Sequence, residues 1–141
     1  MQQRDYIKRQ LEELGKVLAK ILADIMRLKE HGKIQEAYVL AKDNLVSQFD
    51  LDMEHILSLS KEDFQLLIIK GNQLNPTQLN YLAELLYTSA GLLEEKEEQQ
   101  INDLYTKALL IYQHLNRVEK TFSIEREKKI TAIEQHFKTI S

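Results

Sequence analysis

The chain of 141 residues is long enough to bury a hydrophobic core, and its 43% hydrophobic and 29% charged residues are typical of a folded domain. A net charge of −3 gives no reason to expect nucleic-acid binding, and the lack of cysteine excludes disulfides, thiolate zinc sites and cysteine nucleophiles. No apolar run reaches the ~18 residues of a membrane span, so we expect one cytoplasmic domain over residues 1–141 with no membrane contact.

Only four glycines and one proline interrupt the chain, which predicts an all-α fold of about six to seven helices. Short connections between long helices indicate antiparallel hairpins. The predicted helices, in chain order, span residues 3–29, 33–49, 52–59, 60–71, 76–95, 99–117 and 123–138.

Turn and cap residues set these boundaries. His31-Gly32 ends the first helix, and Gly71-Asn72 ends the fourth. Ser60 with Asp63 approximates a capping box, and Asn75 precedes Pro76 at the first position of the fifth helix. We expect the fourth helix to bury its apolar side chains, namely Phe64, Leu67 and Ile68.

The first helix carries apolar residues at alternating steps of four and three, the spacing of one helix face. Val17, Leu22 and Met26 widen this stripe to about half of the helix circumference, which predicts a core face covered by neighbouring helices. The alternative is a homodimer that uses Ile7, Leu11, Leu14 and Leu18 as its seam. The whole stripe comprises Ile7, Leu11, Leu14, Leu18, Ile21, Ile25 and Leu28.

Two segments resemble the second helix of a tetratricopeptide repeat. In "GKIQEAYVLAKDNL" (32–45), Ala37 and Ala41 take the two small positions, and in "LYTKALLIY" (104–112) Ala108 takes the second. Small residues let a neighbouring helix approach closely. The equivalent positions Ala37 and Ile101 lie about 64 residues apart instead of the ~34 of a tandem array. The resemblance therefore implies a divergent, tetratricopeptide-like fold.

A second resemblance covers most of the chain. Four segments, "RDYIKRQLEELGKVLAKIL", "LSKEDFQLL", "LNPTQLNYLAELL" and "YTKALLIY", occur in this order in the chain. Their combination is similar to a family of small bacterial proteins described as a domain of unknown function with tetratricopeptide-like helices. This resemblance implies a bacterial, cytoplasmic, helical protein and supplies no catalytic residue.

Motifs that carry chemistry are not evident. The four histidines lie far apart and none forms an HExxH or ExxH pair, and no glycine-rich phosphate loop occurs. "EEKEE" (94–98) is interpreted as a solvated helix end, and "EREKKI" (125–130) as a mixed-charge surface. We therefore expect no enzyme activity, no metal and no cofactor.

These observations predict a non-catalytic interaction module that holds a protein or peptide in a groove. By analogy with tetratricopeptide repeats, the groove is lined by the first helix of the better-matched hairpin, at Asn80, Glu84, Tyr87 and Thr88. The alternatives are a structural homo-oligomer through the first helix, and an enzyme that binds a small molecule or a metal inside a helical bundle. The latter predicts a closed polar pocket with clustered acids and a histidine.

Overall fold

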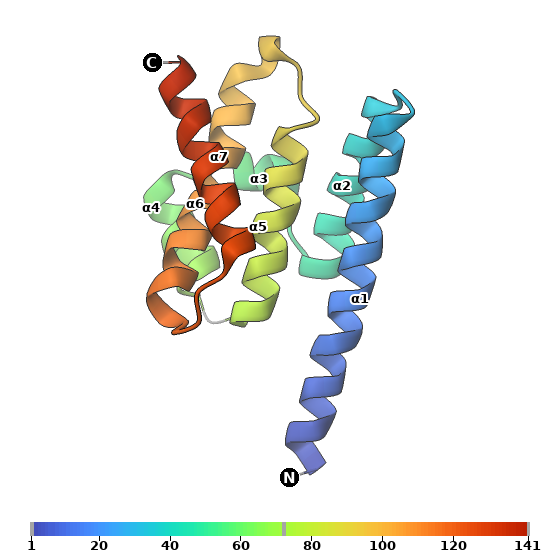
Figure 1. Cartoon of the computed structure of the whole chain (residues 1–141), viewed down its shortest axis with the longest axis vertical. Coiled ribbons are helices and arrows are strands. Elements are labelled where there is room, and N and C mark those ends of the chain that lie inside the picture. The colour runs from blue at the N-terminus through green and yellow to red at the C-terminus, as the bar shows by residue number, and fades with distance from the viewer. Residues whose placement is uncertain (1, 72, 141) are drawn as a thin grey trace.

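The computed structural model describes residues 2–71 and 73–140, and within them the chain forms seven α-helices and no strand (Figure 1). A π-helical turn continues the fourth helix, and a 3-10 turn precedes the sixth. In chain order the elements are α1 (Gln2–Glu30), α2 (Ile34–Phe49), α3 (Met53–Ser58), α4 (Lys61–Phe64), η1 (Gln65–Ile69), α5 (Pro76–Ala90), η2 (Glu95–Glu97), α6 (Glu98–Val118) and α7 (Ile124–Ile140).

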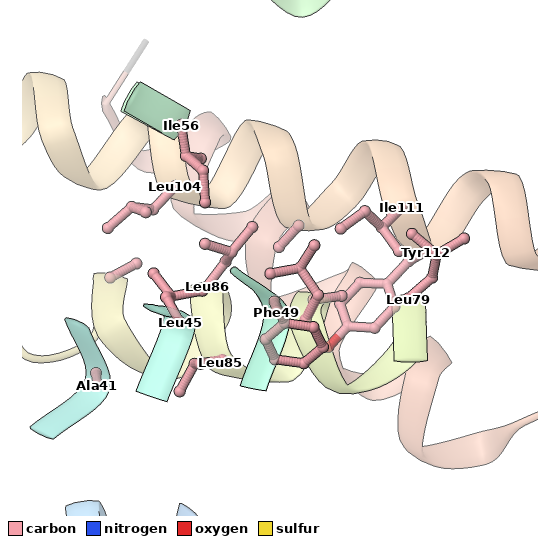
Figure 2. Close-up of a cluster of buried hydrophobic side chains, with 14 of the residues drawn as sticks. Ala41, Leu45, Phe49, Ile56, Leu79, Leu85, Leu86, Leu104, Ile111 and Tyr112 are labelled. Atoms are coloured by element: carbon pink, nitrogen blue, oxygen red, sulfur yellow. The ribbon is translucent and has the colours of Figure 1, made fainter. Parts of the chain in front are cut away.

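Antiparallel helix pairs build the molecule, as the sequence predicts. The pair α5–α6 is the most extensive contact, and α7 packs against α6 on its outer side (Figure 1). On the other side of α5 lies α2, which pairs with α1. Figure 2 shows the resulting core, in which Leu45 and Phe49 of α2 face Leu86 of α5 and Tyr112 of α6.

Local signals in the sequence place several helix ends. Gly32 ends α1 with a left-handed φ of 75°, a conformation that other residues rarely adopt. The Ser60 hydroxyl accepts a hydrogen bond from the Asp63 backbone N–H at 3.1 Å, as the capping pattern predicts. At the start of α5, Asn75 and Gln78 form a reciprocal capping box, with bonds of 2.9 and 3.0 Å.

One predicted detail of the middle segment is wrong. Leu67, predicted to be buried, is 57% exposed because the chain forms a π-helical turn there, in which Lys70 N–H bonds to the Gln65 carbonyl five residues earlier. The wider turn rotates Leu67 away from the core while Ile68 and Ile69 stay buried. Helical structure ends at Ile69, and the predicted terminator Asn72 lies outside the described residues.

The helix predicted over residues 76–95 is also shorter than expected. It ends at Ala90, and the backbone then turns, with the Leu92 N–H bonded to the Ser89 carbonyl at 3.1 Å. This turn brings Leu92 into the core, where only 4% of it is exposed. The free energy gained by burying Leu92 therefore exceeds that of continuing the helix into the acidic residues 94–98.

The first helix is covered over only part of its length. It has 29 residues, whereas its antiparallel partner α2 has 16, so about 13 residues at the N-terminus extend past α2 (Figure 1). Leu18 and Ile25 are buried as predicted, but Ile7 is 55% exposed. Val17 and Met26, predicted to widen the core face, are 45% and 41% exposed. The buried stripe is thus narrower and shorter than the sequence predicts.

The capping box at α5 gives a stability test. Replacing the cap in Asn75→Ala removes the acceptor for the Gln78 N–H, and we expect the free energy of unfolding to fall by about 1 kcal/mol. Urea titration followed by circular dichroism measures this change. Asn75→Asp, which keeps an acceptor oxygen, should stay close to the original stability, and equal losses in both variants would contradict the role of the cap.

Candidate functional site

Two of the four predicted groove residues of α5, Glu84 and Tyr87, lie beside α7. Glu84 forms an ion pair with Lys129 of α7, and the Lys129 ammonium also lies 6.0 Å from the centre of the Tyr87 ring. Asn80 and Thr88 on the same helix are partly exposed. The structure therefore brings Glu84 and Tyr87 together around a side chain of the chain's own last helix, which occupies this part of the predicted peptide face.

Aromatic side chains continue this contact along α6 and α7. Tyr87 packs on Tyr105 with ring centres 5.6 Å apart, and Tyr105 packs on His136 at 4.9 Å. The Nε2 atom of His136 is hydrogen-bonded to the Asn102 side-chain oxygen at 2.8 Å. Burial, and next the neighbouring Tyr87, raise the pKa of Tyr105, which keeps its hydroxyl protonated.

The segment interpreted as a mixed-charge surface is partly buried, which corrects that interpretation. Arg126 is only 7% exposed, and its guanidinium donates to the side-chain oxygens of Asn116 at 3.1 Å and Glu119 at 2.7 Å. Both partners belong to the end of α6 and the turn after it. Arg126 and Lys129 therefore fasten α7 at two points, because each places its charge beside a carboxylate.

A buried tyrosine, Tyr112, lies near both Glu84 and Arg126. Tyr112 of α6 is fully buried, and this burial, followed by the negative charge of Glu84, raises the pKa of its hydroxyl. The phenol is therefore neutral at physiological pH. It is suited to packing in the core and unsuited to accepting a proton from a substrate.

Lys107, like Arg126, is a buried charged residue whose burial the sequence did not predict. It is 3% exposed, and its ammonium donates to the Leu57 carbonyl oxygen at 3.4 Å. Burial lowers the pKa of Lys107, and the nearby Asp103 partly opposes this. The side chain satisfies a carbonyl near the end of α3 and so joins that short helix to α6. Lys107 directly precedes Ala108 in the sequence, and no local pattern there predicts that the lysine is buried.

An enzyme inside a helical bundle would need a polar pocket with acids and a histidine. The groove that best fits this description lies between η2, α6 and the end of α7. Glu95, Glu98 and His136 contribute to its lining, beside apolar Ile101 and Ile140. The Nε2 atom of His136 is already bonded to Asn102, so it is not directed at a ligand. Within residues 2–71 and 73–140, no three histidine, aspartate or glutamate side chains are grouped as a metal ion needs.

None of the helices in this part of the chain is both long and apolar enough to span a membrane.

The clearest unpartnered feature is the N-terminal half of α1. Residues 3–10 are all exposed, including Tyr6 at 62% and Ile7 at 55%, while Leu11 and Leu14 are partly exposed. These apolar residues continue the line that is buried at Leu18 and beyond. Among the seam residues proposed from sequence, Ile7 is therefore exposed and Leu18 is buried. Leu11 and Leu14 are partly accessible, and Leu14 packs in part against the core.

A shallow groove runs beside this stripe where α1 meets the start of α5. Tyr81 crosses over Gly15, whose missing side chain makes room for it, because a Cβ atom there would lie 2.8 Å from the Tyr81 hydroxyl oxygen. The floor is largely apolar. Its lining comprises Lys8, Leu11, Glu12, Gly15, Lys16 and Ala19 of α1 with Thr77 and Tyr81 of α5.

The chain matches no protein-family model, no curated protein and no solved structure. A function for it must therefore be inferred from its own geometry.

The attachment of α7 is open to a direct test. Lys129→Met leaves the Glu84 carboxylate without its cation, and we expect the free energy of unfolding to fall by about 1–3 kcal/mol. The double variant Glu84→Gln/Lys129→Met should regain part of this loss because no lone charge remains. Urea titration measures both variants.

Lys128→Met is the matched control, since Lys128 neighbours Lys129 in sequence but is exposed. Its stability should stay within about 0.5 kcal/mol of the unmodified protein. Equal losses for the two lysines would show that the Glu84–Lys129 pair does not hold α7.

Proposed function

We propose that this chain is a non-catalytic helical interaction module, which holds an α-helix of a partner against the N-terminal half of α1. The observation that carries the proposal is that the apolar stripe of α1 continues from Leu14, which still packs partly against the core, through the partly exposed Leu11 to the exposed Ile7, where α2 no longer covers it. The spacing of four and three residues along this stripe is the one by which two helices pack side by side.

Energetics favour a covered state for this surface. Fully burying an isoleucine or leucine side chain contributes roughly 1.5–3 kcal/mol, and the chain alone forgoes part of this at Ile7, which is 55% exposed. Single exposed apolar residues are common on protein surfaces, but here the exposed Ile7 is followed along the same helix face by the partly exposed Leu11 and Leu14. A partner helix that presents a similar stripe would cover them together.

The tetratricopeptide resemblance supports a role in binding proteins and is itself part of this proposal. The three small residues that carry it, Ala37, Ala41 and Ala108, are fully buried between helices, which agrees with close helix approach. In such repeats the first helix of each hairpin lines the groove. Here Glu84 and Tyr87 of α5 are engaged by α7, whereas α1, the first helix of the other hairpin, has free length. We therefore assign the binding surface to α1.

A variant on this surface tests the function. Tagged protein is used to capture partners from cells that express it, with stoichiometry read by mass spectrometry. Ile7→Glu places a charge at the most exposed leucine or isoleucine of the stripe, and we expect a stoichiometric partner to be reduced at least tenfold. The substitution is at an exposed position, so circular dichroism should show an unchanged fold.

Leu66→Glu serves as the control because Leu66 is similarly exposed, at 61%, and belongs to η1, which continues α4 on the side of the bundle away from α1 (Figure 1). It should retain the partner at the original level. Equal retention by Ile7→Glu and Leu66→Glu would show that α1 is not the binding surface.

A further inference from the structure

We propose that one end of the bundle docks on the surface of a membrane that contains anionic phospholipids. This end comprises the turn between α6 and α7, the helix ends beside that turn, and the residue that follows η1; the start of α5 lies at the same end (Figure 1). We call it the basic tip, and its residues are Lys70, Arg117, Val118, Lys120, Phe122 and Ile124. The inference goes beyond the proposed function, because it concerns a surface on helices other than α1.

Three apolar side chains of the basic tip are exposed to water. Phe122 lies in the turn and is 72% exposed, the largest fraction among the large hydrophobic side chains of the described residues. Ile124 and Val118, on either side of the turn, are also mostly exposed. Apolar side chains on a turn at the end of a bundle suit insertion into a fluid lipid layer, whereas a partner helix packs along a groove or a helix face.

The cations of the basic tip are free to contact anions. Lys70, Arg117 and Lys120 are exposed, and within residues 2–71 and 73–140 none of them forms an ion pair. Burial, and next the positive charges of Arg117 and Lys70, lower the pKa of His114 on α6. Two of the three cations therefore lie near the same side chain, although one follows η1 and the other belongs to α6.

The acids at this end are mostly engaged within the molecule. The Glu119 carboxylate pairs with the Arg126 guanidinium at 2.7 Å, and Glu127 accepts a hydrogen bond from the Asn116 side chain at 3.1 Å. Glu125, in the first turn of α7, is exposed and offsets one of the three cations. The basic tip therefore keeps an excess of positive charge, although the whole chain has a net charge of −3.

The distribution of charge along α6 defines an orientation. The helix starts beside η2, where residues 94–98 carry four glutamates and one lysine. Because α6 has 21 residues, about 30 Å separates this acidic end from the basic tip (Figure 1). An anionic membrane attracts the basic tip and repels the opposite end. The free end of α1 extends on the side of the basic tip, and its residues 4–9 carry three cations and one acid, so it adds no repulsion (Figure 1).

An anionic bilayer surface matches both kinds of side chain at the basic tip. Apolar side chains enter the boundary between headgroups and acyl chains, while lysine and arginine pair with lipid phosphates. Each basic residue near such a surface strengthens binding about fivefold. We therefore expect reversible binding that weakens when salt is added, because salt screens the charges. This inference replaces the expectation of no membrane contact, which was drawn from the lack of a spanning segment, since docking at the surface needs no such segment.

Co-sedimentation of the full chain with lipid vesicles tests the inference. Vesicles of phosphatidylcholine and phosphatidylglycerol in equal parts should bind the chain at least tenfold more tightly than vesicles of phosphatidylcholine alone. Phe122→Glu should weaken binding to the mixed vesicles at least tenfold, because it puts an anion in place of the inserted ring. Val39→Glu is the matched control, since Val39 is 54% exposed on α2 and the variant adds the same charge. It should bind the mixed vesicles as the unmodified chain does.

A fluorescent reporter tests insertion directly. The chain has no tryptophan, so Phe122→Trp provides a single emitting residue. Its emission should shift to shorter wavelengths when mixed vesicles are added, and lipids with brominated acyl chains should quench it. Val39→Trp should keep the emission of a side chain in water. Emission from Phe122→Trp that is unchanged by the mixed vesicles would contradict insertion of the basic tip.

No binding to the mixed vesicles, or equal binding by Phe122→Glu and Val39→Glu, would overturn the inference. If the vesicles do not bind the chain but Phe122→Glu loses a protein captured from cells that Val39→Glu retains, the basic tip binds that protein and not a membrane. Ile7→Glu changes α1 alone, so it should keep its binding to the mixed vesicles even where it loses a partner helix. Failure of the proposed function and failure of this inference are therefore distinguishable.

Discussion

The antiparallel pairing of α5 with α6 is the contact on which the other helices depend. Its two sides receive different partners, with α2 packed on α5 and α7 packed on α6. The largest buried side chains, among them Leu86, Leu104 and Tyr112, lie at this junction (Figure 2). Because α2 is held there by Leu45 and Phe49, the position of α1 is fixed in turn, although α1 itself touches the central pair only through part of its length. Removing the central pair would leave each outer helix with one apolar face in water.

Because α1 is longer than α2, part of its apolar stripe has no neighbouring helix, and the proposed function depends on this part. A helix that extends beyond its own hairpin partner keeps its regular spacing, since backbone hydrogen bonds within a helix need no neighbour. Its apolar residues do need one. The side chain of Leu18 is buried, Leu14 and Leu11 are covered only in part, and Ile7 is exposed to solvent. We propose that this exposed stripe is half of a helix–helix interface, attached to a bundle that defines its direction. We propose that this arrangement serves a binding role.

The last helix occupies part of the face of α5 that the repeat analogy assigned to peptide binding. Lys129 meets Glu84 and Tyr87 there, while Arg126 holds the start of α7 to Asn116 and Glu119. A helix in cis has a high effective concentration, so it competes with any external peptide for this surface. The buried charges also explain why α7 is regular although its apolar residues are few. Ile130 and Ile133 pack inward, and ion pairs secure the remaining contact.

Most helix boundaries were predictable from the sequence, because caps and turns are decided by neighbouring residues. Gly32, Ser60 and the pair Asn75-Pro76 act where their local chemistry indicates. The all-α class followed equally from the scarcity of breakers. Only the tertiary structure decided which part of each apolar helix face is covered by a neighbouring helix. Periodicity marks the face of a helix that is apolar but does not say how far its neighbour reaches, so Leu18 and Ile7 look alike in sequence and differ in exposure from 2% to 55%. The burial of Arg126 and Lys129 depended likewise on acids that lie 7 and 45 residues away along the chain, a distance that no local pattern spans.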